Sequence, residues 1–341
     1  MEFTLDIASF ALKTFMIVAA IAIVLLIIIQ SGMRSRKSRH GLDIENLNDR
    51  YDDFRHLMQS ELLDKKELKN LLKSEKKEEK KAAKKEEPKL PRIFVMDFDG
   101  DIRATAVQDL REQITAILTV SQAGDEAVVR LESGGGLVTS YGLAASQLSR
   151  LKMKGIRLTI CVDKIAASGG YMMACVADHI VAAPFAVLGS IGVIAQVPNF
   201  HKVLKKHDVD YREVTAGEFK RTVTVMGEIT DHGMKKFKEQ IEETHDLFKH
   251  FVKSNRPVVD IAQVATGEYW YGTKALELRL ADQLSTSDDY LYSRREEANL
   301  YLISHQGKKK LSERLSESFG KAAHSLFLKI WGDLDRSRFG A

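Results

Sequence analysis

Apolar and polar positions follow several distinct patterns along the chain, and each pattern predicts its own kind of element. The first is an apolar run over residues 14–29 that contains no charged side chain. Residues 8–12 extend it, interrupted only by Lys13, whose aliphatic stem lets its ammonium reach the membrane interface. A hydrocarbon core needs about 20 apolar residues in a helix. Acidic residues precede the run, whereas a cleaved signal peptide favours a basic start, so residues 1–32 are predicted to hold a retained transmembrane helix.

Residues 33–90 are polar and dense in charges of both signs. Opposite charges stand three positions apart, as in Lys76 and Glu79, and such pairs support a solvated helix by a few tenths of a kcal/mol each. The leucines of this region do not hold a heptad for long. The pattern therefore favours a charged helical linker over a coiled-coil stalk, and Pro88 and Pro91 end it.

From Ile93 onward, short apolar runs alternate with helical patterns. This alternation predicts an α/β domain with largely buried strands over residues 91–304. A helical stripe of Met234, Phe237, Ile241, Phe248 and Phe251 is interpreted as core packing. The expected strands are 92–98, 127–133, 157–163, 179–183, 190–195 and 210–216.

The tail, residues 305–341, is a basic amphipathic pattern. Its apolar positions fall on one helical face, and lysines and arginines occupy much of the rest. Such a helix can lie on an anionic membrane, and it can equally dock onto the same domain or onto a neighbouring subunit. The pattern alone leaves these alternatives open. The apolar positions are Leu311, Leu315, Phe319, Ala322, Leu326 and Ile330.

Composition narrows the function classes. The 341 residues carry a formal net charge of +4, which is not the strongly basic footprint of a nucleic-acid-binding protein. The ten histidines are scattered, and no metal-binding spacing of His or Cys occurs, so neither a metal nor another cofactor is predicted. The two cysteines, Cys161 and Cys175, stand in apolar surroundings and are interpreted as buried thiols.

Three stretches carry candidate chemistry. In "VDKIAASGGYMMACVAD", Ser168 stands among small residues between a predicted strand and a predicted helix, which suits either a nucleophile or a plain helix N-cap. In "RLESGGGLVTSYG", three glycines between a strand and a helix suit either an oxyanion cradle or an ordinary turn. In "TAGEFKRT", Lys220 would serve as a base only if burial removed its proton.

These stretches, together with "GSIGV" and "GEYWYGTKALELRLAD", occur in an order that resembles one family. The chain is similar to the signal-peptide-peptidase A family of bacterial serine proteases, family S49, and especially to its SohB-type inner-membrane branch. The resemblance covers about residues 91–304 and the N-terminal anchor. It implies a ClpP/crotonase-like ββα superhelix.

The resemblance also implies roles for individual residues. Ser168 matches the nucleophile and Lys220 the general base of a Ser–Lys dyad. Ser190 matches a hydroxyl that orients the lysine, and Tyr171 is expected to line the site. One oxyanion amide is expected from Gly135 or Gly136 and the other from Gly169. Gly134 stands where the family usually has proline, and glycine would loosen this turn.

The resemblance further implies a homo-oligomer whose sites are completed between subunits, acting on extended apolar peptides or unfolded proteins. Such a substrate would add as a strand to a sheet edge, supplied either by "VMDF" or by residues 191–195. Partners would be the substrate and membrane lipid, without nucleic acid. Alternatives are an inactive peptide-binding scaffold and, less favoured, a crotonase-like acyl-CoA enzyme.

The side of the inner membrane on which the domain lies is left open. Family resemblance suggests the periplasm, whereas the positive-inside tendency of a basic cluster after the span suggests the cytoplasm. That cluster consists of Arg34, Arg36, Lys37 and Arg39.

Overall fold

The computed structural model describes residues 41–82 and 90–305. The predicted transmembrane helix and residues 306–341 of the predicted tail lie outside this range. No helix within the described ranges is long and apolar enough to cross a membrane. The chain divides into two units, of which residues 44–304 hold nearly all of the described structure. Of the other unit, 1–43 with 305–341, only residues 41–43 and 305 are described.

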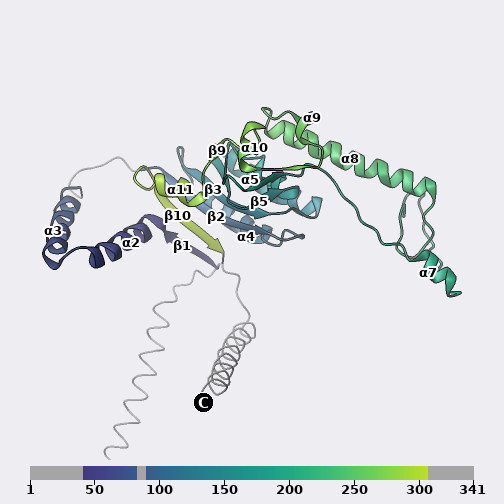
Figure 1. Ribbon diagram of the computed structural model, residues 1–341, viewed down its shortest axis with the longest axis horizontal. Helices are drawn as coiled ribbons and strands as arrows, with labels where there is room; N and C mark the ends of the chain where they lie inside the picture. The colour runs from purple at the N-terminus through teal and green to yellow at the C-terminus, as the bar shows by residue number, and fades with distance from the viewer. Residues whose placement is uncertain (1–40, 83–89, 306–341) are drawn as a thin grey trace, which may run out of the picture. The chain divides into compact units, whose positions relative to one another are not determined.

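A ten-stranded, mostly parallel sheet forms the centre of residues 44–304 (Figure 1). Its main path runs β1-β10-β2-β3-β4-β6-β9, and the short strands β5, β7 and β8 extend it beyond β3. Only the pairing of β7 with β8 is antiparallel among the pairings described. The strands are β1 (Leu42–Asn46), β2 (Arg92–Gly100), β3 (Glu126–Ser133), β4 (Arg157–Val162), β5 (Ile165–Ala167), β6 (His179–Ala182), β7 (Val187–Gly189), β8 (Tyr269–Tyr271), β9 (Gln283–Leu284) and β10 (Asn299–His305).

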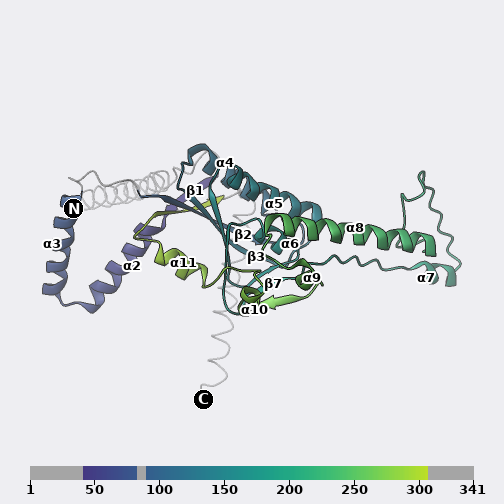
Figure 2. The same ribbon diagram turned by 90° about the horizontal axis from the view of Figure 1, so that it is seen from above.

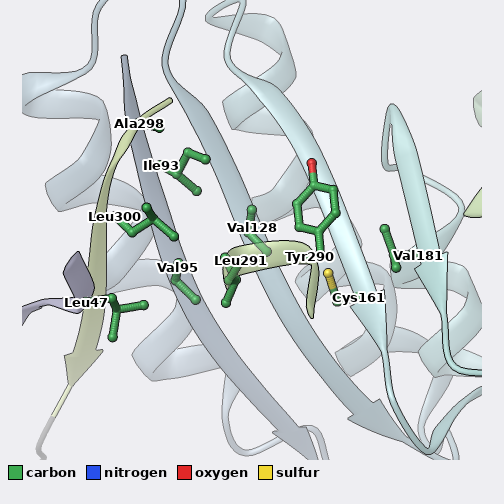
Figure 3. Close-up of a cluster of buried hydrophobic side chains, with 10 residues drawn as sticks. All are labelled: Leu47, Ile93, Val95, Val128, Cys161, Val181, Tyr290, Leu291, Ala298 and Leu300. Carbon is green, nitrogen blue, oxygen red and sulfur yellow. The ribbon is translucent and has the colours of Figure 1, made fainter. Parts of the chain in front are cut away.

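The central strands are nearly continuous apolar runs because helices cover both faces of a parallel sheet. On one face, side chains from the five adjacent strands β10, β2, β3, β4 and β6 pack with α2 and α11 (Figure 3). Helices α4, α5 and α6 cover the other face (Figure 2). Figure 3 labels the first cluster, which consists of Leu47, Ile93, Val95, Val128, Cys161, Val181, Tyr290, Leu291, Ala298 and Leu300.

Helices and strands alternate through much of the chain, but β4 with β5 and β6 with β7 are consecutive strands, and α2 with α3 and α7 to α9 are consecutive helices. α2 is anchored by Asn48, whose amide donates to the carbonyls of Arg295 and Ala298 and whose oxygen accepts from Leu300 N–H. The helices are α2 (Leu47–Leu62), α3 (Lys65–Ala82), α4 (Val107–Val120), α5 (Val138–Met153), α6 (Gly169–Ala174), α7 (His201–Lys206), α8 (Asp231–Asn255), α9 (Ile261–Val264), α10 (Gly272–Glu277) and α11 (Ser287–Ser293).

Between β7 and the middle of α8, the chain forms a projecting segment, residues 193–242, which we call the arm. In both views, α7 and the loop that follows it lie at the N-terminal end of α8, away from the sheet (Figures 1 and 2). Phe200 N–H donates to Val225 O over 2.8 Å and closes the arm on itself. Within the arm, exposed apolar side chains are frequent: Ile194, Val197, Phe200, Val203, Val209, Tyr211, Val214, Phe219, Val225 and Met226.

Four predicted strands are confirmed as β2, β3, β4 and β6, and two predicted strands are wrong. Residues 190–195 do not continue β7, because the backbone turns at Ser190, where φ is 51°. Residues 210–216 lie in the arm, where no neighbouring strand is available to pair with them. The stripe on α8 is also less buried than predicted, since Phe248 alone of its five members is fully buried.

The two thiols are free and buried, as predicted. Burial raises the pKa of the Cys175 thiol to about 12 and raises that of Cys161 further still. Both side chains therefore act as small apolar groups in the core.

Candidate functional site

Ser168 occupies a strained corner between β5 and α6. Its backbone has φ 53° and ψ −117°, a conformation that costs free energy in a residue with a Cβ. Its side chain makes no capping hydrogen bond to α6, so the N-cap alternative does not describe this serine. Its N–H donates to Gly189 O over 2.8 Å, which ties the corner to β7. The hydroxyl is thus held at a sharp turn without a partner among the described residues.

The glycine loop lies directly against this corner. Gly135 has φ +88°, and a Cβ there would lie 2.6 Å from Gly169 N and 2.8 Å from Ser168 Cβ. A Cβ on Gly136 would lie 2.1 Å from Ile102 O. Only glycine fits at these two positions, because the backbone approaches other backbone too closely for a side chain.

The amides of the loop differ in their partners. Gly135 N–H donates to Ser133 Oγ over 3.1 Å. The N–H groups of Gly136 and of Gly169, the first residue of α6, have no partner among residues 41–82 and 90–305. Gly136, Gly169 and Ser168 line one cavity. Two residues with unpaired amides and a serine with a free hydroxyl therefore line the same space.

That cavity measures about 400 Å³ and is mainly apolar. α5 contributes Val138, Gly142 and Ser146, and α8 contributes Thr244 and three apolar side chains. The space suits an apolar side chain next to a reacting carbonyl. Its apolar lining consists of Val138, Met172, Val193, Ile194, Leu247, Phe248 and Phe251.

Ser190 directly follows β7, the strand beside the corner. β5 and β7 pair in parallel with Ala167 opposite Gly189, so Ser168 and Ser190 follow them at neighbouring positions. Ser190 also has a positive φ, and its N–H donates to Glu268 O. No hydrogen bond joins the two serine side chains in the described structure.

Lys220 is not part of this arrangement within one copy of the chain. It is exposed and lies in the loop between α7 and α8, which both views place away from the sheet (Figures 1 and 2). It does not line the cavity, and no described contact joins it to Ser168. The structure thus brings together Ser168, Ser190, Gly135, Gly136 and Gly169, but not the lysine.

Two further expectations need correction. Tyr171 is fully buried and its hydroxyl donates to Leu280 O over 3.2 Å, so it packs in the core instead of lining the cavity. Burial raises the pKa of this phenol. "VMDF" belongs to β2, which is paired on both sides by β10 and β3 and offers no free edge. Residues 191–195 line the cavity in part, but they form no strand.

Sequence reasoning missed the contribution of α8 and of α5 to the cavity. Phe248 and Phe251 were interpreted as core residues because a helical stripe of apolar positions indicates burial but does not identify what packs against it, and Leu247 was not singled out at all. It also missed Tyr141, which is fully buried beneath the glycine loop. No group of His, Cys, Asp or Glu suited to hold a metal ion occurs in the described part of the chain.

Comparisons with known proteins agree with the resemblance. Residues 2–148 match the profile "Peptidase family S49 N-terminal", and residues 150–301 match "Peptidase family S49". A "Probable protease SohB" of Haemophilus influenzae is 49% identical over 331 residues, which are 92% of this chain and 93% of that one. Another, of Buchnera aphidicola subsp. Acyrthosiphon pisum, is 54% identical over 240 residues, 70% and 71% of the two chains. A solved structure of the 1510-N membrane-bound stomatin-specific protease with a substrate peptide covers 67% of this chain at TM-score 0.43 and 11% identity.

Proposed function

Because this chain belongs to peptidase family S49, we propose that it is a serine endopeptidase in which the Ser168 hydroxyl attacks the carbonyl carbon of an extended apolar peptide. The observation that carries the proposal is the corner at Ser168: a free hydroxyl in a strained turn, beside two unpaired amides and an apolar cavity. The mixed α/β fold is consistent with the finer ClpP/crotonase-like assignment that the family resemblance implies.

The reaction assigns a task to each group. As the Ser168 oxygen bonds to the carbonyl carbon, its proton passes to the neutral amine of Lys220, which later protonates the leaving amine. Water then hydrolyses the acyl-enzyme. The N–H groups of Gly169 and of the glycine loop stabilise the oxyanion, which is worth a factor of about 10²–10³ in rate per donor. Ser190, next to Ser168, orients the lysine amine.

The lysine in this scheme comes from a second copy of the chain. Lys220 is remote from Ser168 in its own copy, and it lies on an arm with many exposed apolar side chains. An arm of this kind suits burial against another subunit. Burial of an amine favours its neutral form, which is the form that a general base requires. Homo-oligomerisation would therefore bring the Lys220 amine to Ser168 and, by burying this amine, favour the neutral form that acts as a base.

The membrane-anchored setting remains part of the proposal. The apolar run at residues 14–29 supports an anchor in the bacterial inner membrane, where signal-peptide remnants and misfolded proteins supply apolar substrates. The position of Lys220 favours one alternative function, a scaffold that binds apolar peptides in the cavity without cleaving them.

Covalent labelling tests the nucleophile. In detergent, a fluorophosphonate should label wild-type protein at Ser168, and cleavage of a denatured protein should be lost in Ser168→Ala. Ser146→Ala, a second serine on the cavity wall, should keep both. Labelling without turnover would favour the scaffold. Equal turnover by wild type and Ser168→Ala would refute the peptidase mechanism.

A further inference from the structure

Beneath the glycine loop, a line of hydrogen bonds runs between buried groups. Gly135 N–H donates to Ser133 Oγ over 3.1 Å, and Ser133 Oγ lies 2.5 Å from Tyr141 Oη. Tyr141 Oη lies 2.7 Å from Asp101 O. The side chains of Ser133 and Tyr141 are almost entirely buried, at 2% and 0% exposure. Water therefore does not compete for these bonds.

The direction of each bond follows from the proton count. A carbonyl oxygen can only accept, so the single proton of Tyr141 goes to Asp101 O. Burial raises the pKa of this phenol, so the proton stays in place. Ser133 then directs its own proton to Tyr141 Oη, which is closer than its other acceptor, Gly100 O at 3.1 Å. The oxygen of Ser133 is left free to accept from Gly135, and the aligned bonds strengthen one another.

The ring of Tyr141 reaches the second half of the site. A Cβ on Gly169 would lie only 2.5 Å from Tyr141 Cγ, so the ring packs directly on the first residue of α6. One side chain thus contacts the residue whose amide opens α6 and, through Ser133, holds the glycine loop. These two backbone segments carry the unpaired amides of Gly136 and Gly169, the two glycines that line the cavity beside Ser168.

We propose that Tyr141, acting through Ser133, is a positioning residue that engages the amide of Gly135 and so presents the amide of Gly136 to the oxyanion. This inference rests on the proposed function, because it concerns the amides that would hold the reaction's oxyanion. It also explains why Gly135 does not line the cavity whereas Gly136 does. Tyr141 does not touch the substrate and is not a catalytic residue.

The variant Tyr141→Phe keeps the ring on Gly169 and removes only the hydroxyl. Tyr290→Phe is a matched control, because the Tyr290 hydroxyl also hydrogen-bonds to buried side chains, those of Glu126 and Thr159. Glu126 begins β3, so this contact lies at the end of β3 that is remote from Ser133. Ser133→Ala and the double variant Tyr141→Phe/Ser133→Ala complete a cycle. Each is assayed with an apolar peptidyl coumarin amide and with a peptide boronate, which mimics the oxyanion.

We expect Tyr141→Phe to lower kcat about tenfold with KM within about twofold, because the amide acts in the transition state and not on the bound substrate. Boronate affinity should fall by a similar factor. The double variant should lose little more than either single variant, since both break one line of bonds. Tyr290→Phe should lower the melting temperature without this split between kcat and KM. Equal kcat in Tyr141→Phe and Tyr290→Phe would overturn the proposal.

Hydrogen–deuterium exchange separates this inference from the peptidase proposal. Residues 134–137 contain two hydrogen-bonded amides in wild type, those of Gly135 and Leu137, and Tyr141→Phe should speed exchange of the Gly135 amide while that of Leu137 stays protected. Exchange that is the same in both proteins would overturn the positioning role, even if Ser168 is the nucleophile. If Tyr141→Phe exposes the amide but the fluorophosphonate never labels Ser168, the positioning contact would stand and the peptidase proposal would be refuted.

Discussion

Neighbouring glycines at the site tolerate a side chain to very different degrees. A Cβ on Gly135 would collide with Gly169 N, and φ +88° disfavours any other residue. A Cβ on Gly134 meets only Ile165 Cδ1 at 3.8 Å, an ordinary contact, and its φ lies outside the left-handed region. The fold therefore does not require glycine at position 134, where the family usually has proline.

Gly134→Ala and Gly135→Ala should consequently behave in opposite ways. We expect Gly134→Ala to retain cleavage and to raise the free energy of unfolding by about 0.4–1 kcal/mol, because alanine restricts the unfolded chain. Gly135→Ala should abolish cleavage and lower stability. Melting curves and turnover of a denatured protein measure both. Loss of activity in Gly134→Ala, or full activity in Gly135→Ala, would contradict this description of the loop.

The sequence could predict the residues of the corner at Ser168, but it could not predict that Tyr141 supports this corner or that Lys220 lies far from it. Small residues around Ser168 and the run of glycines mark close backbone approach, which is a local property. Tyr141 escaped notice because it stands in an ordinary apolar helix pattern, and its bond to Ser133 depends on how α5 packs. The separation of Lys220 from Ser168 depends on the path of the whole arm, which no local pattern encodes.

At the scale of elements, α5 and α8 form two walls of the cavity beside Ser168. α5 presents Gly142, where an added Cβ would meet nothing within 4 Å. α8 presents Leu247, Phe248 and Phe251 from across the cavity. A glycine within a helix usually lowers stability, so its presence here is explained by the space that it leaves.

Gly142→Leu should therefore fill the cavity while strengthening α5. We expect stability to rise by up to about 1 kcal/mol, because leucine is a better helix former than glycine. Cleavage after bulky apolar residues should fall relative to cleavage after alanine. A peptide series that differs only at the residue before the cleaved bond measures this ratio. An unchanged ratio would mean that the substrate side chain binds elsewhere.

The fold was predictable where burial repeats along the chain. β2, β3 and β4 are long apolar runs and were recognised, as were the helices between them. The two- and three-residue strands β5, β7, β8 and β9 were missed because their pairing comes from neighbouring strands and not from their own pattern. β8 illustrates this, since its Trp270 packs over Gly189 of β7.

At the scale of the whole molecule, the arm and α8 project from the domain, and only the C-terminal part of α8 is packed against it. α8 has 25 residues, a length of about 38 Å, yet only Phe248 and Val252 are fully buried, near its C-terminal end. This end is fixed by Arg256, which is 5% exposed and donates to both carboxylate oxygens of Asp282. A projecting segment that is fixed at one end in this way can place Lys220 next to a neighbouring subunit.

Co-expression of two inactive chains tests whether Lys220 acts between subunits. Ser168→Ala and Lys220→Ala should each be inactive alone. Mixed assemblies should recover roughly a quarter of wild-type activity if one neighbour supplies the lysine and subunits mix at random. If the lysine acted within its own chain, every mixed assembly would stay inactive. The same chains purified separately and combined without subunit exchange provide the control.

The sealing of both cysteines in the core has a practical consequence for following the arm. Because neither thiol reacts readily near neutral pH, a single new cysteine introduced by Glu218→Cys would be the preferred target for a maleimide dye. Its fluorescence would then report whether the tip of the arm lies in water or against protein, and neither native cysteine would have to be replaced. The two native cysteines would therefore contribute little background labelling to such a measurement.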